Sequence, residues 1–231
     1  MLHHIDKEKG KKYTFIVKSN WTDCIVEYDN IFSNDVYQKY KSRLNGVEGE
    51  LIVCTNLNKI DGFCKKIVQE TYQEYQEFIL SRDFTKEQWV YNILDEIAEQ
   101  NKILYHDDLV VIAPNYTWDS LDLSKMYLLL FPTDKSLHSI RDLNSTHINL
   151  LEHAKSKTLE IIADKYGFDS AIIKMYLHYA PTTYHLHIHF VLISNTDANS
   201  SVEYSHDLNT VITNLKIKSD YYQSVMLNKR I

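Results

Sequence analysis

Residues 185–190 read His-Leu-His-Ile-His-Phe, a strict alternation of imidazole and apolar side chains. Successive side chains of a β-strand point to opposite faces of a sheet, so this spacing predicts a strand with His185, His187 and His189 on one face. The other face is apolar, and the apolar run continues to Ile193, as in a strand whose far side is buried. The stretch therefore predicts a core strand that presents a row of imidazoles to a cleft.

Three interpretations fit such a row of histidines. Buried imidazoles could hydrogen-bond one another, although each desolvated ring needs a partner of its own. The rings could instead bind a metal ion, because neutral imidazole is a common zinc ligand. In the third interpretation, which we favour, one histidine is a nucleophile, and its neighbours orient it and hold its target.

The residues before the histidines make the interpretation more specific. Residues 176–190 read Tyr-Leu-His-Tyr-Ala-Pro-Thr-Thr-Tyr-His-Leu-His-Ile-His-Phe. This segment resembles the histidine-triad superfamily of nucleotide hydrolases and transferases, and within it the scavenger mRNA-decapping family, whose triad follows a similar Leu-His-Tyr-x-Pro segment. Residues 32–37, 88–95 and 139–143 resemble blocks of the same family in the same order. The resemblance extends from about Phe32 to the C-terminus.

The hydrophobic pattern, together with this resemblance, predicts an α+β fold in two domains. Residues 1–84 are expected to form a small mixed α/β domain, with strands over 13–18 and 51–55 and a helix over 59–78. Residues 85–231 are expected to form a histidine-triad-type domain, with helices packed on an antiparallel sheet. Its predicted helices cover 85–102, which opens on a capping-box pattern at Thr85, 145–167, which ends at Gly167, and about 208–215. Its predicted strands cover 109–113, 126–131, 172–179, 184–193 and 221–227.

Composition limits the partners and the location. The chain has 231 residues and a formal net charge of -6, which argues against gripping DNA or long RNA through a broad basic face. A short capped fragment needs only a few local cations. Cys24, Cys54 and Cys64 are dispersed, so a disulfide framework or a zinc ribbon is not expected. No apolar run approaches the roughly 18 residues of a membrane span, so we expect a soluble protein of the cytoplasm or nucleus.

The chemistry that we expect centres on His187. A neutral imidazole is a competent nucleophile near pH 7. The resemblance implies that His187 attacks the phosphate attached to 7-methylguanosine, and that water then hydrolyses the nucleotidyl-histidine. The products would be m7GMP and a nucleoside or oligonucleotide diphosphate, with no metal or other cofactor. His185 and His189, if partly protonated, would donate hydrogen bonds to phosphate oxygens, and His178 is a candidate phosphate ligand or leaving-group acid, or else a buried partner of a tyrosine.

The resemblance also implies how a cap is recognised. A positively charged methylguanine suits an aromatic face and a carboxylate, and the matching residues are Trp89 and Glu99. Without the resemblance, Trp89 would be a core residue and Glu99 a solvated one. Asn34 and Tyr37 resemble residues that close over the cap from the smaller domain, which in this family exchanges elements in a homodimer. The match of Lys65 or Lys66 to a lysine facing the phosphates is looser, and a solvated pair is an equal interpretation.

Two segments depart from the family pattern. Residues 114–118 read Pro-Asn-Tyr-Thr-Trp where the family tends to have Pro-Asp-Leu-Lys-Trp, and two threonines replace a Ser-Tyr pair before the triad. The pocket residues expected from these segments are Pro114, Asn115, Tyr116, Thr117, Thr182 and Thr183. These changes leave two alternatives to a decapping enzyme, namely a general dinucleoside polyphosphate hydrolase and an inactive cap-binding module.

Overall fold

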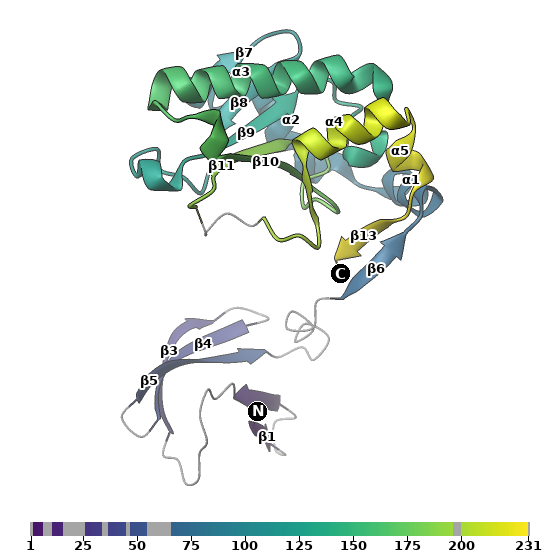
Figure 1. The fold of residues 1–231 in the computed structure, drawn as a ribbon. Helices are drawn as coiled ribbons and strands as arrows, with labels where there is room; N and C mark the ends of the chain where they lie inside the picture. The colour runs from purple at the N-terminus through teal and green to yellow at the C-terminus, as the bar shows by residue number, and fades with distance from the viewer. Residues whose placement is uncertain are drawn as a thin grey trace. The chain divides into compact units, whose positions relative to one another are not determined.

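The computed structural model describes residues 2–6, 11–15, 26–33, 37–44, 47–54, 66–195 and 200–230, with side-chain contacts in the last two ranges. The chain divides into two compact units, Met1–Lys65 and Lys66–Ile231 (Figure 1). The unit boundary lies between residues 65 and 66, whereas the sequence analysis placed a domain boundary near residue 84. Within the described ranges, none of the helices combines the length and apolar character needed to cross a membrane.

The described part of the first unit consists of antiparallel strands. Strands β1 (Leu2–Asp6) and β2 (Lys11–Phe15) pair with each other. A three-stranded sheet has the order β3-β4-β5, with β3 at Val26–Ser33, β4 at Tyr37–Leu44 and β5 at Val47–Cys54. The strands predicted over 13–18 and 51–55 overlap β2 and β5.

Residues 66–84 belong to the second unit, because β6 (Ile67–Glu70) pairs with β13 (Leu227–Arg230) near the other end of the chain. Helix α1 (Tyr72–Ser81) follows, with Thr71 and Glu74 forming a capping box. The helix predicted over 59–78 is therefore wrong at 67–70, where the backbone is extended.

The second unit is built on a six-stranded antiparallel sheet with the order β12-β10-β11-β9-β8-β7. Its strands are β7 (Tyr105–His106), β8 (Val110–Pro114), β9 (Tyr127–Pro132), β10 (Ile173–His178), β11 (Ile188–Leu192) and β12 (Ser205–Asp207). The predicted apolar strands over 109–113, 126–131 and 172–179 correspond to β8, β9 and β10. Short 3-10 turns connect the elements: η2 (Phe84–Glu87), η3 (Gln100–Lys102), η4 (Leu123–Lys125), η5 (Ile140–Asp142), η6 (Ser145–His147) and η7 (Ser170–Ile172).

Side-chain alternation divides the sheet into two faces. One face carries Ile188 and Phe190 of β11, both fully buried in the main core under α3 (Ile148–Tyr166) and α4 (Leu208–Ile217) (Figure 1). The opposite face carries Leu129 and Phe131 of β9, which pack with the buried side of α2 (Gln88–Leu94) in a smaller cluster. The histidines of the candidate site lie on this second face.

Several predicted helix ends and strands differ from the structure. Helix α2 ends at Leu94, not near residue 102, and the first turn before it is capped by Asp83 rather than Thr85. Asn144, not Ser145, caps the turn that leads into α3, and Gly167 ends that helix in the left-handed conformation as predicted. The strand predicted over 221–227 is a short helix, α5 (Tyr221–Ser224), followed by β13.

A buried arginine joins the start and the end of the second unit. Arg141 is fully buried and donates hydrogen bonds to the carbonyl oxygens of Tyr222 and Val225, each at 2.7 Å, and to that of Glu70. It also donates to the hydroxyl group of Tyr179 at 3.1 Å, and Tyr179 in turn donates to the Glu70 carboxylate. The guanidinium group therefore links β6, the C-terminal segment and Tyr179, the residue that follows His178.

Candidate active site

The candidate site lies on β11 and on the residues that lead into it. The strand covers 188–192, shorter than the predicted 184–193, so His189 is in the strand and His187 immediately precedes it. His189 lies opposite Leu129 of β9 and Tyr176 of β10. The predicted alternation holds within the strand, because Ile188 and Phe190 are buried on the core face while His189 points to the other.

The backbone of the triad orients His187. Its Nδ1 atom lies 2.8 Å from the carbonyl oxygen of His185. A carbonyl oxygen only accepts hydrogen bonds, so Nδ1 carries the proton and Nε2 keeps a free lone pair. Burial lowers the pKa of His187, which favours the neutral ring at neutral pH. His187 therefore has the tautomer and the charge state that a nucleophile requires.

His178, at the end of β10, completes a cluster with His187 and His189. The ring centroid of His189 lies 4.3 Å from that of His178 and 4.9 Å from that of His187. One ring nitrogen from each of the three lies within 4.8 Å of the others. Burial lowers the pKa of His189 well below its ordinary value, so the ring is neutral rather than cationic at neutral pH.

His185 lies on the same face as the other two histidines, beside Phe131, but it does not line the cavity. The side chain is fully buried, and its Nε2 atom donates to the carbonyl oxygen of Pro132 at 2.8 Å. The ring packs edge-on against Tyr91 of α2, with centroids 5.8 Å apart. Burial lowers the pKa of His185 to about 4. His185 thus contributes to the site through its carbonyl oxygen, which accepts the hydrogen bond from Nδ1 of His187.

A cavity of about 250 Å³ opens beside the histidine cluster. Six of the predicted site residues other than histidines line it. The lining residues are Trp89, Asn115, Tyr116, Thr117, Tyr127, Leu129, Phe131, His178, Thr182, Thr183, His187 and His189. Pro114, the last residue of β8, is not among them. The segments that depart from the family pattern therefore do form part of the cavity wall.

Trp89 and Glu99 differ in their placement. Trp89 lies on α2 with 44% of its surface exposed, and its ring meets Phe131 edge-on at a centroid distance of 6.0 Å. It is therefore an accessible ring at the cavity and not a core residue. Glu99 lies beyond the end of α2 with a φ of 58°, pairs with Lys102 at 3.4 Å, and does not line the cavity.

The N-terminal candidates fall mostly outside the described residues. Asn34 and Lys65 lie outside the described ranges, and Tyr37 is described only as the first residue of β4. Lys66 is exposed directly before β6 and does not line the cavity.

The sequence analysis missed three residues of β9. Tyr127, Leu129 and Phe131 alternate along the strand and all line the cavity. The hydroxyl group of Tyr127 lies 2.7 Å from Nδ1 of His189, and Phe131 lies beside both His185 and His187, with centroid distances of 6.3 and 6.1 Å. Alternation in the predicted strand over 126–131 grouped these residues, but the sequence contained no sign of which face meets the histidines.

The histidine cluster also tests the metal interpretation. Three imidazoles with an open fourth position are a familiar zinc site, in which Zn–N distances of about 2.0–2.1 Å place the nitrogens about 3.3 Å apart. The separations of up to 4.8 Å here would have to shrink before one ion could contact all three rings.

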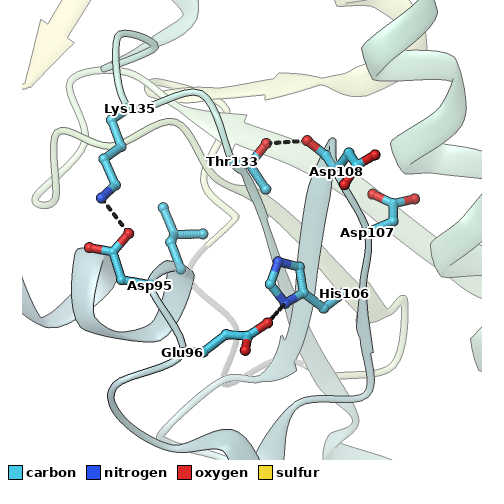
Figure 2. Close-up of a pocket in the computed structure, with 8 residues that line it drawn as sticks. Asp95, Glu96, His106, Asp107, Asp108, Thr133 and Lys135 are labelled. Atoms are coloured by element: carbon cyan, nitrogen blue, oxygen red, sulfur yellow. Dashed lines mark hydrogen bonds and ion pairs between the residues drawn. The ribbon is translucent and has the colours of Figure 1, made fainter.

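A second cavity, of about 430 Å³, is charged but internally paired (Figure 2). Asp95 pairs with Lys135 at 2.5 Å, and Glu96 with His106 at 3.1 Å. Asp107 accepts hydrogen bonds from the backbone of Leu109 and Val110, which help to hold its pKa at about 2 despite partial burial. These ion pairs and hydrogen bonds give the charged side chains a structural role. The residues that line the cavity are Leu94, Asp95, Glu96, His106, Asp107, Asp108, Thr133 and Lys135.

A family model and several curated relatives match most of this chain. The family model described as "Scavenger mRNA decapping enzyme C-term binding" matches residues 88–226. The m7GpppX diphosphatase of Ascaris suum is 35% identical over 222 residues, which cover 89% of this chain and 74% of the relative. The human m7GpppX diphosphatase is 31% identical over 206 residues, which cover 83% of this chain and 61% of the relative. This chain therefore spans about three fifths of the human relative's length.

A solved structure shows a weaker likeness. The aprataxin ortholog Hnt3 from Schizosaccharomyces pombe aligns with a TM-score of 0.40 and 19% identity, covering 64% of this chain and 86% of that one. The stronger result is the sequence match, because the family model covers the cavity-lining residues from Trp89 to His189. The chain belongs to the scavenger mRNA-decapping enzyme family.

Proposed function

We propose that the chain hydrolyses free cap structures or short capped RNA fragments, releasing m7GMP and a nucleoside or oligonucleotide diphosphate. The observation that carries the proposal is the free Nε2 lone pair of His187, which results from the hydrogen bond between its Nδ1 and the carbonyl oxygen of His185. The m7GpppX diphosphatase relatives support the choice of substrate.

The reaction proceeds in two steps at His187. Nε2 bonds to the phosphorus next to 7-methylguanosine, and the bond from that phosphorus to the bridging oxygen breaks. The diphosphate leaves with the electron pair and takes up a proton, for which His178 is the candidate acid. Water then attacks the phosphorus and gives a proton to His178, which restores the acid, while the P–N bond breaks and its electron pair returns to Nε2. The carbonyl oxygen of His185 stabilises the positive charge that His187 carries between the steps.

The base binds at the outer part of the cavity. The exposed ring of Trp89 offers a face to the cationic methylguanine, and such a contact contributes up to about 2 kcal/mol when dry. Thr182 and Thr183 line the cavity, and their hydroxyl groups can donate to phosphate oxygens. We expect Asn34 and Tyr37 to contribute from the first unit in a homodimer.

One observation favours a second candidate, a general dinucleoside polyphosphate hydrolase. Among the described residues that line the cavity, none carries a carboxylate for the base donors of guanine. If Glu99 does not reach the bound base, no carboxylate of the described cavity residues would help Trp89 to select the methylated cap.

Hydrolysis of m7GpppG beside GpppG, with EDTA present and the products separated by chromatography, tests both candidates. Release of m7GMP with strong preference for the methylated substrate supports the decapping enzyme, while equal turnover supports the general hydrolase. No turnover in EDTA that is restored by zinc would overturn the metal-independent mechanism. Binding of m7GpppG without turnover of either substrate would leave a cap-binding module.

A further inference from the structure

Tyr127 forms the hydrogen bond that reaches His189 from β9. Its hydroxyl oxygen lies 2.7 Å from Nδ1 of His189, and the two strands are direct neighbours in the sheet. On its other side the His189 ring stacks on Tyr176, with centroids 4.9 Å apart and planes 6° from parallel. The plane of the imidazole and its rotation are therefore both fixed, the first by a ring contact and the second by a hydroxyl group.

The proton positions in this pair follow from burial. Burial raises the pKa of Tyr127 to about 12, so the phenol keeps its proton at neutral pH. His189 is only 4% exposed and its pKa is lowered, so the neutral ring carries a single N–H. In the described part of the chain Nε2 of His189 is buried without a hydrogen-bond partner. Donation from Tyr127 to Nδ1 satisfies the phenol and places the ring proton on that free Nε2.

We propose that Tyr127 is a positioning residue, whose hydroxyl group holds His189 as the Nε2–H tautomer so that a neutral imidazole donates to an oxygen of the attacked phosphate. This inference rests on the proposed function. A ring nitrogen of His189 and one of His187 lie within 4.8 Å of each other, so one phosphate can contact both rings at the same time. The two rings would then act in opposite tautomers, His187 through a bare Nε2 and His189 through a protonated one.

This assignment explains how His189 stabilises charge without becoming a cation. A neutral donor that already points at the developing charge needs no proton uptake and no reorganisation when the substrate binds. The buried, unpartnered Nε2 atom is costly in the free protein, and a phosphate oxygen would satisfy it.

Tyr127→Phe tests the inference because it removes only the hydroxyl group. We expect kcat for m7GpppG to fall 10- to 100-fold, the range for loss of a group that orients a ligating histidine, with KM changed less than threefold. Nitrogen-15 NMR of histidine-labelled protein should show Nε2 of His189 protonated in the wild type and a tautomer mixture in Tyr127→Phe. Tyr105→Phe is the matched control, since it removes a 2.8 Å hydroxyl hydrogen bond to Asp107 in the same sheet, away from the cavity.

Each result separates this inference from the proposed function. A bare Nε2 in wild-type His189, or an unchanged kcat in Tyr127→Phe, overturns the positioning role even if the cap is hydrolysed. If wild-type protein does not hydrolyse m7GpppG, the proposed function fails, and the NMR comparison still decides whether Tyr127 sets the tautomer. Equal losses of kcat in Tyr105→Phe would assign the effect to general destabilisation and also overturn the role.

Discussion

His187 is held by His185 through a backbone contact: Nδ1 of the one lies 2.8 Å from the carbonyl oxygen of the other. No side chain is needed for this contact, because the peptide two positions earlier provides the acceptor. The orientation of the His187 ring therefore depends on the path of the backbone over residues 185–187. The buried His185 ring fixes that path by donating to the carbonyl oxygen of Pro132.

Replacing His187 with Asn should abolish hydrolysis and leave cap affinity within a few-fold of wild type. The amide keeps a similar shape but has no lone pair on a ring nitrogen with which to form the intermediate. Single-turnover rates and titration with m7GpppG measure the two effects separately. His153→Asn is the control, since His153 pairs with Asp107 outside the cavity. Turnover of His187→Asn within about tenfold of wild type would refute the nucleophile assignment.

Trp89→Ala should weaken m7GpppG binding about tenfold or more and GpppG binding less, because only the methylated base is a cation. Fluorescence titration with both ligands measures the difference. Trp89→Phe retains an aromatic face and should recover most of the preference. Equal losses for the two ligands would show that the methylated base does not stack on Trp89.

Stability should fall as the pH drops from about 6.5 to about 4. The folded state holds the pKa of His185 at about 4, against about 6.5 when unfolded, so between these values the unfolded chain binds a proton that the folded chain does not. The free energy of unfolding then decreases with falling pH, by about 3 kcal/mol for this group, and the contribution is constant above pH 6.5. Urea unfolding at several pH values in this range gives the free energy of unfolding as a function of pH. This free energy should change less steeply with pH in His185→Met than in the wild type, and identical pH dependence would contradict the assignment.

Arg141→Lys should lower the free energy of unfolding by about 3 kcal/mol, because a single ammonium group cannot serve the three carbonyl oxygens that the guanidinium group joins. Arg230→Lys is a matched control, since Arg230 is partly exposed, pairs with Glu203 at 3.6 Å and contacts the ring of Tyr204. Equilibrium urea unfolding measures both variants. Equal, small losses would mean that the buried network contributes little.

The histidine motif predicted the part of the site that depends on local geometry. Alternation requires His189 to oppose Ile188 and Phe190, and burial of the apolar pair in the main core confirmed it. The full burial of His185 and its hydrogen-bond partner could not be predicted in this way. Its acceptor, the carbonyl oxygen of Pro132, is 53 positions away, and the strand begins only at Ile188.

The helix predicted over 85–102 was too long for a related reason. Val90, Ile93 and Leu94 pack against the sheet. Ile97, by contrast, is 71% exposed and is not part of this cluster. Helices of this length are stabilised mainly by packing, so the helical pattern beyond Leu94 was not sufficient. Glu99 was thereby separated from Trp89, with which the sequence had grouped it.

The strand pair β6–β13 has a consequence for biosynthesis. Lys229 of β13 donates a hydrogen bond to the carboxylate of Glu70 in β6, 159 positions earlier. Arg141 donates to the carbonyl oxygen of Glu70 and to those of Tyr222 and Val225. When the ribosome has just translated the histidine motif, residues 222–230 have not yet been synthesised. We therefore expect the nascent unit to keep this edge of β6 unpaired until residues 227–230 have left the exit tunnel.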